Sequence, residues 1–262
     1  GQTGGSAGQT GGSGGSAGSA GSGGSGIVTT PNVFADLLGL APTTIDARLE
    51  NDFQTIFHGA DDTRIYFDFD DDESYIYSAN SDDIRTEGMS WGMMLAVQLD
   101  KRTEFDRLWA FAKNRMQHPS GDHQGYFCWQ TDTSGNCLED SPAPDGEEYF
   151  TMALFFASHR WGNGGVHDYE ADAQALLDTM LWDHPSWVTA MFDPASKIVV
   201  FCPGGEAATY SLCSYIMPGF YELWARWDDD DAGRAFWAEA RDAGRAVLQA
   251  AAHPTAGLHP YA

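Results

Sequence analysis

Positive charge is scarce in this sequence, and lysine most of all. Only 14 of the 262 residues are Lys or Arg, three of them Lys, against 38 Asp and Glu, so the net charge is −24 at pH 7. A chain of this charge repels polyanions, and we therefore expect neither nucleic acid nor an anionic membrane surface as a partner. No apolar run is long enough to span a bilayer either, which excludes an integral membrane protein.

Cysteines are also few: Cys128, Cys137, Cys202 and Cys213. None forms a C-x-x-C pair, and no His lies at zinc-finger spacing from them, so no metal site is expected. Cys128 and Cys202 lie in apolar surroundings, which favours buried free thiols. Because the chain shows no export signal, we expect reduced cysteines and a cytoplasmic location.

Residues 1–26 contain only Gly, Ser, Ala, Gln and Thr. Such a segment cannot bury enough apolar surface to offset its ordering entropy, which predicts a flexible tail. It has neither the basic start nor the apolar centre of a signal peptide. Residues 27–262 are long enough for one sizeable core, and we expect them to form one domain.

Beyond residue 30 the pattern is mainly helical. Apolar residues at helical spacing predict seven or eight helices, one within residues 43–59 and others at 87–99, 103–116, 146–161, 169–182, 215–227 and 231–252. Residues 63–79 alternate around an acidic turn and predict a β-hairpin, and residues 196–201 predict a strand. Helix following helix indicates an all-α toroid of helical hairpins rather than a βαβ protein.

Two carboxylates stand ahead of apolar helices, Glu87 in "RTEGMSW" and Asp145 in "APDGEEYF". Acids are favoured in a first helical turn, so Glu87 is explained by the helix dipole alone and Asp145 as an N-cap of the helix from residue 146. A proton donor is the alternative for Glu87. That role needs a raised pKa, from desolvation by Met89 and Trp91 or from a second carboxylate. These residues by themselves leave both interpretations open.

Aromatic residues make up 13% of the chain. Most must lie in the core, but Trp129 and Tyr215 fall in predicted loop or edge positions, where a ring can stack on the apolar face of a sugar. Carboxylates beside exposed aromatic rings, without a metal or nucleotide motif, are typical of a carbohydrate-active site.

Four stretches resemble glycoside hydrolase family 8, and most of all its reducing-end xylose-releasing exo-oligoxylanases: "RTEGMSWGMMLAVQLDKRTEFDRLW", "GYFCWQ", "APDGEEYFTMALFFASHRWG" and "HPTAGLHPYA". The resemblance runs from about Phe34 to the last residue. It implies an (α/α)6 barrel and an inverting hydrolase of β-1,4-xylo-oligosaccharides that needs no cofactor. By the same resemblance Glu87 is the general acid, and Asp145 holds and distorts the sugar. Trp129 and Tyr215 line the sugar subsites.

The family's catalytic base is an Asp beyond the segment that matches "HPTAGLHPYA". The resemblance therefore places the base beyond this chain, with residues 27–262 as the N-terminal portion of the catalytic domain, an incomplete barrel with short β-hairpins, inactive alone. An endo-acting family 8 xylanase, cellulase or chitosanase is the alternative within the family. A non-catalytic carbohydrate-binding fragment is the alternative from another class. The sequence leaves chain-length preference and oligomeric state open.

Overall fold

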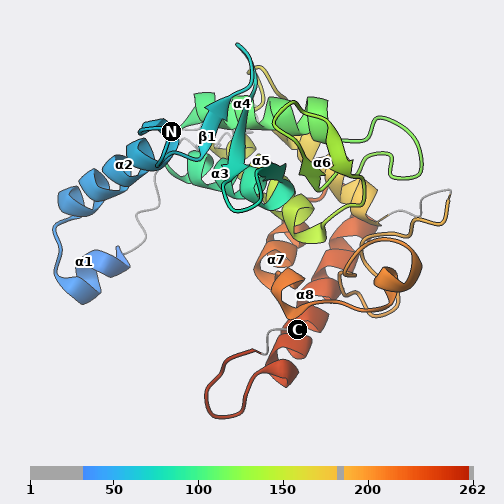
Figure 1. Ribbon diagram of the computed structural model, residues 1–262. Coiled ribbons are helices and arrows are strands. Elements are labelled where there is room, and N and C mark those ends of the chain that lie inside the picture. Colours follow the sequence, from blue (N-terminus) through green and yellow to red (C-terminus); the bar gives the residue numbers. More distant parts are fainter. Residues whose placement is uncertain (1–31, 182–185, 260–262) are drawn as a thin grey trace, which may run out of the picture. The chain divides into compact units, whose positions relative to one another are not determined.

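The computed structural model describes residues 32–181 and 186–259 (Figure 1). The tail predicted for residues 1–26 lies outside these ranges.

The chain divides into two units, residues 1–47 and 48–262. The described part of the first unit contains helix α1 (Val33–Leu38), which the apolar pattern did not predict. The Asn32 side chain caps it, accepting hydrogen bonds from the N–H groups of Phe34 and Ala35. Helix α2 (Pro42–His58) begins in this unit and continues into the second.

The second unit contains a five-stranded antiparallel sheet. Its strands follow chain order: β1 (Tyr66–Asp68), β2 (Ser74–Ser78), β3 (Asp83–Arg85), β4 (Gln130–Thr131) and β5 (Cys137–Glu139). Strands β1 and β2 form the predicted hairpin around the acidic turn. Pairing of β3 with β4 sets Arg85 opposite Gln130. The sheet thereby brings residue 129 beside the point where β3 leads into the next helix.

The described part of the second unit also contains six further α-helices: α3 (Thr86–Gln98), α4 (Arg102–Phe111), α5 (Pro144–Trp161), α6 (Tyr169–Leu181), α7 (Pro218–Trp227) and α8 (Asp231–Ala251). All six were predicted, with boundaries that differ by up to five residues. The end of the helix predicted to residue 116 is a π-helical turn, Ala112–Met116. The strand predicted at 196–201 is wrong, because only an isolated bridge joins Phe192 to Val199.

Helices α3 and α5 pack along their length and run parallel. At their starts Gly146 of α5 lies against Thr86 of α3. At their ends Arg160 of α5 forms an ion pair with Asp100, which follows α3 (N–O distance 3.1 Å). Both helices carry apolar residues around most of their circumference, as expected for helices enclosed by others.

Helix α7 runs in the same direction as α5. The rings of Phe220 and Tyr149 meet near the starts of the two helices, with centroids 5.0 Å apart. The rings of Trp227 and His159 meet near their ends, at 4.5 Å. Three parallel helices therefore present their N-terminal ends to one side of this unit.

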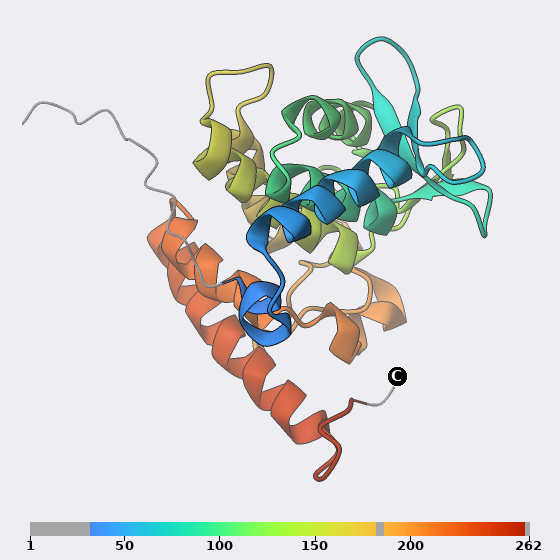
Figure 2. The ribbon, with the colours of Figure 1, turned by 90° about the vertical axis from the view of Figure 1, so that its left-hand side faces the viewer.

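Helices α4, α6 and α8 return alongside α3, α5 and α7 after short links, so each pair is an antiparallel hairpin (Figures 1 and 2). Buried tryptophans fill the interfaces. Trp109 of α4 donates its indole N–H to Asp172 of α6 (2.7 Å), and Trp237 of α8 donates to Asp228 (2.8 Å). Across the described ranges, none of the helices has the length and apolar character needed to cross a membrane.

Candidate active site

Glu87 lies in the first turn of α3, at the point where β3 passes directly into the helix. Its side chain is partly exposed, and the Thr86 hydroxyl donates a long hydrogen bond to Oε2 (3.5 Å). Behind it Met89 is fully buried, whereas Trp91 stays 52% exposed. The carboxyl group thus stands at the rim of the core with an open side.

Asp145 lies in the first turn of α5, but it is not the N-cap. The helix begins at Pro144 with Ala143 in the cap position, so the N-cap interpretation of Asp145 is wrong. Proline has a fixed φ and no N–H, which suits the first helical position and starts the helix earlier than predicted. One oxygen of Asp145, Oδ1, is buried and has no hydrogen-bond partner among the described residues.

Glu87 and Asp145 line one cavity of about 340 Å³. Its other described lining residues come from β2, β3 and the first turns of α3: Ile76, Tyr77, Ser78, Arg85, Gly88 and Trp91. The contact of Gly146 with Thr86 explains the convergence, because it joins the first turns of α3 and α5. The structure thus brings the two sequence-predicted acids to a single site.

Burial, together with the nearby Glu87 carboxylate, raises the pKa of Asp145 to about 6. Backbone N–H groups at the start of α5 act in the opposite direction. Asp145 therefore exchanges its proton nearer to neutral pH than an ordinary aspartate does. This arrangement can bind sugar hydroxyls and transfer a proton.

Trp129 is held beside the cavity. Its ring lies under the guanidinium group of Arg85, at 5.1 Å from the ring centroid, and its carbonyl accepts a hydrogen bond from the Thr86 N–H (3.0 Å). The side chain is partly exposed. Trp129 is not among the described residues that line the 340 Å³ cavity. Its ring contacts Arg85, which does line the cavity.

Tyr215 lies in a 3₁₀ turn (Cys213–Tyr215) just before α7 and is partly exposed. Its ring stacks parallel to that of Phe201, with centroids 5.9 Å apart. Burial raises the pKa of the Tyr215 hydroxyl, and the negative charges of Asp145 and Glu87 raise it further. The turn that carries Tyr215 contacts α5, the helix of Asp145, although Tyr215 is not among the described residues that line the cavity.

Sequence reasoning missed Arg85 as a site residue. It lines the cavity, pairs with the buried Asp83 (3.1 Å) and covers the Trp129 ring. Its place in the sequence could have indicated this role, because Arg85 ends a strand two residues before Glu87. Trp91, considered only as a desolvating neighbour, also lines the cavity, one helical turn after Glu87.

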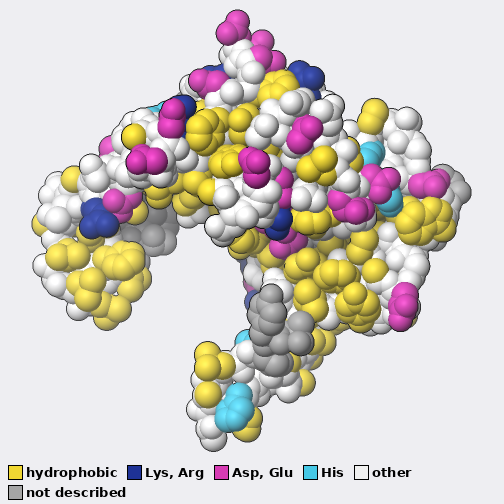
Figure 3. Space-filling model, viewed as in Figure 1, with side chains coloured by type: hydrophobic (Ala, Val, Ile, Leu, Met, Phe, Trp, Pro, Cys, Tyr) yellow, Lys and Arg dark blue, Asp and Glu magenta, His cyan; other side chains and the backbone are white. Residues whose placement is uncertain are grey.

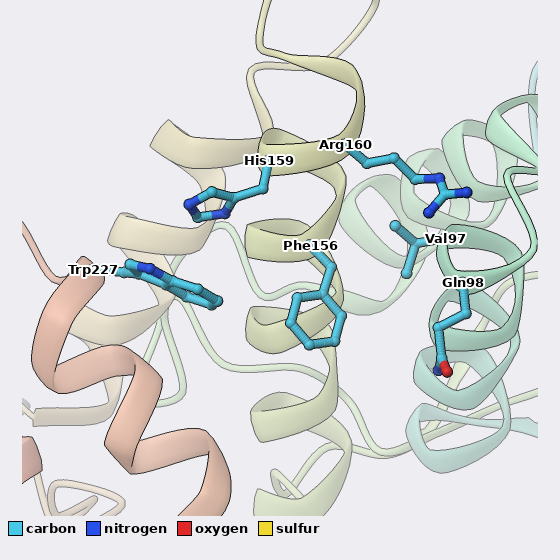
Figure 4. Close-up of a pocket in the computed structure, with 6 residues that line it drawn as sticks. All are labelled: Val97, Gln98, Phe156, His159, Arg160 and Trp227. Carbon is cyan, nitrogen blue, oxygen red and sulfur yellow. The ribbon is translucent and has the colours of Figure 1, made fainter. Parts of the chain in front are cut away.

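A second cavity, of about 420 Å³, lies at the opposite ends of the parallel helices (Figure 4). Figure 4 shows His159 and Trp227 facing each other from α5 and α7, with Phe156 below them and Val97 on α3. The described residues that line it carry no carboxyl group. It therefore lacks the pair of carboxyl groups found in the acidic cavity, which is the candidate active site.

The expectation of reduced cysteines is wrong for one pair. Cys128 and Cys137 form a disulfide, with Cα atoms 6.0 Å apart. Cys128 precedes β4 and Cys137 opens β5, so strand pairing brings the two residues together, a relationship that their spacing did not reveal. Cys202 and Cys213 are free thiols. In the described ranges, no three His, Cys, Asp or Glu side chains are grouped as a metal site requires.

Comparison with known proteins identifies the family. The model of glycosyl hydrolases family 8 matches residues 72–261. The chain belongs to glycoside hydrolase family 8. The resemblance seen in the sequence is thereby confirmed, and the fold of this family is an (α/α)6 barrel.

Among curated family 8 proteins, the chain is 44% identical to the reducing-end xylose-releasing exo-oligoxylanase Rex8A of Paenibacillus barcinonensis, over 85% of the chain. It is 39% identical to the corresponding exo-oligoxylanase of Halalkalibacterium halodurans, over 87% of the chain. Each alignment covers 58% of the relative, so the chain spans less than two thirds of their length. A solved structure of a Rex8A mutant from Paenibacillus barcinonensis, in complex with an arabinofuranosyl-xylotetraose, superposes with a TM-score of 0.83 at 43% identity, covering 89% of this chain and 60% of the other.

Proposed function

We propose that the whole protein is an inverting glycoside hydrolase that removes xylose from the reducing end of β-1,4-xylo-oligosaccharides. Residues 27–262 belong to its catalytic domain. The observation that carries the proposal is the convergence of Glu87 and Asp145 on one 340 Å³ cavity of a family 8 chain. The substrate class rests on the names of the two curated relatives, both exo-oligoxylanases.

Glu87 is the proton donor in this proposal. An inverting glycosidase needs one carboxylic acid to protonate the leaving oxygen and a second carboxylate to activate water on the opposite face of the sugar. Glu87 stands at the rim of the core with an open side, where a glycosidic oxygen can reach it. We assign the base to no residue of this chain.

Asp145 orients the sugar at the bond that is cleaved. Its pKa of about 6 leaves it ionised at neutral pH, when its oxygens accept hydrogen bonds from sugar hydroxyls. The buried oxygen Oδ1, unpartnered among described groups, offers an acceptor that a hydroxyl can satisfy. Holding the ring in one pose supplies part of the rate enhancement.

Trp129 and Tyr215 supply stacking surfaces at the edges of the cavity. Both rings are partly exposed. The Trp129 ring is held by Arg85, and the Tyr215 ring is held by Phe201. A neutral sugar also suits the acidic surface of this chain, on which Asp and Glu outnumber Lys and Arg over the face shown in Figure 3.

The test is product analysis with the whole protein on xylotriose and on xylotriose reduced to its alditol. We expect xylose and xylobiose from the first substrate and no cleavage of the second. Proton NMR of fresh product should show the α-anomer of xylobiose, since inversion converts the β-linkage. Rapid shortening of polymeric xylan without early xylose would favour an endo-acting enzyme. Binding of xylotriose without any turnover would favour the non-catalytic alternative.

A further inference from the structure

Two glutamates directly behind Asp145 are buried, although the proposed reaction uses neither. Glu147 is 1% exposed and Glu148 is fully buried, both in the first turns of α5. Burying an ionisable side chain is costly unless it makes a specific interaction. Since they follow Asp145 by only two and three residues, their burial calls for a structural explanation.

Glu147 reaches a different part of the chain. Its Oε1 accepts a hydrogen bond from the backbone N–H of Phe127, at 3.0 Å. Phe127 is fully buried, and its ring packs against Phe150 of α5 with centroids 4.9 Å apart. A buried N–H needs an acceptor, and Glu147 is the one that serves Phe127.

The segment that Glu147 bonds at Phe127 reaches the candidate active site two residues further along the chain. The carbonyl of Trp129, two residues after Phe127, accepts a hydrogen bond from the N–H of Thr86, the residue before Glu87. Its ring lies under Arg85. Residues 127–129 therefore connect the start of α5 to the start of α3, and Glu147 makes the connection on the α5 side.

We propose that Glu147 is a positioning residue: its hydrogen bond to the Phe127 N–H holds the segment that carries Trp129 in register with the two carboxyl groups of the cavity. The expected consequence of this positioning, the binding of xylo-oligosaccharide, rests on the proposed function. The hydrogen bond itself and its effect on the segment do not depend on that function.

The charge state of Glu147 agrees with this role. Burial raises its pKa well above the ordinary value, and the charge of Asp145 adds to the effect, opposed by the Phe127 N–H. A neutral carboxylic acid keeps a carbonyl oxygen as acceptor and adds no negative charge beside Asp145. A glutamine has the same shape and acceptor, so Glu147→Gln should preserve the contact.

Three variants test the proposal: Glu147→Leu, which removes the acceptor, Glu147→Gln, which keeps it, and Glu148→Leu. Glu148 is a matched control because it is equally buried on the same helix, but Tyr221 is the polar side chain beside it. Hydrogen exchange of peptides covering residues 127–129 reports the segment directly. Xylotriose affinity, by titration calorimetry, and KM against kcat of the whole protein report the site.

We expect Glu147→Leu to speed exchange at residues 127–129 and to weaken xylotriose binding about tenfold, the effect of losing one buried hydrogen bond. Glu147→Gln should leave both near wild type, and Glu148→Leu should leave exchange at 127–129 unchanged. Equal exchange changes in the two Leu variants, or none in Glu147→Leu, would overturn the proposal. If the Leu variants do not fold, Glu147→Ala and Glu148→Ala are compared in the same way.

Failure of the proposed function gives a different result. If wild-type protein neither binds nor cleaves xylotriose, the proposed function fails, while the exchange experiment still decides the role of Glu147. If wild-type protein cleaves xylotriose and exchange at residues 127–129 responds alike at both positions, the function stands and the positioning role fails.

Discussion

Gly146 and Thr86 lie so close that a Cβ atom added to Gly146 would stand 2.5 Å from the Cβ of Thr86. This contact joins the first turns of α5 and α3. Glu87 follows Thr86 and Asp145 precedes Gly146, so the same contact places the two carboxyl groups in one cavity. A glycine at 146 is required because any side chain there meets backbone and β-branched atoms that cannot move aside.

Replacing Gly146 by Ala should therefore destabilise the protein by about 1–3 kcal/mol through overpacking, despite the higher helix propensity of Ala. It should also lower turnover by displacing Asp145 from Glu87. Gly219→Ala in α7 is the control, since its new methyl group meets nothing within 4 Å. Urea unfolding should show the control to be neutral or slightly stabilised. A stable, fully active Gly146→Ala protein would contradict this account of the site.

Glu87→Gln should reduce kcat of the whole protein about 10²–10⁴-fold, because the amide keeps the shape of the side chain but cannot donate the proton. Xylotriose affinity should stay close to wild type. Glu170→Gln controls for the loss of an acid from a first helical turn, since Glu170 is exposed in the first turn of α6. Steady-state kinetics and calorimetry supply both measurements. An active Glu87→Gln enzyme would assign proton donation to another group.

Asp145→Asn should alter the pH dependence of stability. The folded-state pKa of Asp145 is about 6, above its ordinary value of 3.8, so the folded protein binds the proton more tightly than the unfolded chain does. Its contribution to stability is therefore present below about pH 4 and is lost as pH rises through about 6.

The amide has no such titration, so Asp145→Asn should be more stable than wild type at about pH 7, by roughly 1–3 kcal/mol. The difference should shrink at about pH 4. Urea unfolding of both proteins at the two pH values makes the comparison. Sugar binding should weaken even though stability rises. A variant that loses stability at neutral pH would mean that ionised Asp145 has a stabilising partner.

Reducing the Cys128–Cys137 disulfide should lower the free energy of unfolding by about 2–3 kcal/mol, from the entropy of the short loop that it closes. Under denaturing conditions a thiol reagent should count two free thiols before reduction and four after it. Cys202→Ser and Cys213→Ser should each leave the sensitivity to reductant unchanged. Four free thiols in the unreduced protein would restore the original expectation of reduced cysteines.

The sequence by itself determined the elements whose stability is local. Helices α3 and α5 follow from apolar residues at helical spacing, and the β1–β2 hairpin follows from alternation around an acidic turn. Glu87 was placed in a first helical turn for the same reason. The family was also readable, because its motifs are contiguous in the chain.

Only the tertiary structure decided what depends on contacts between distant residues. The raised pKa of Asp145 comes from burial and from Glu87 on another helix. The Cys128–Cys137 disulfide depends on the pairing of β4 with β5, and the hydrogen bond of Glu147 depends on a loop that returns to α5. The spacing of apolar residues shows which face of a helix or strand is apolar, but it does not show which element packs against that face. The cavity and its electrostatics therefore belong to the packing of α3 against α5.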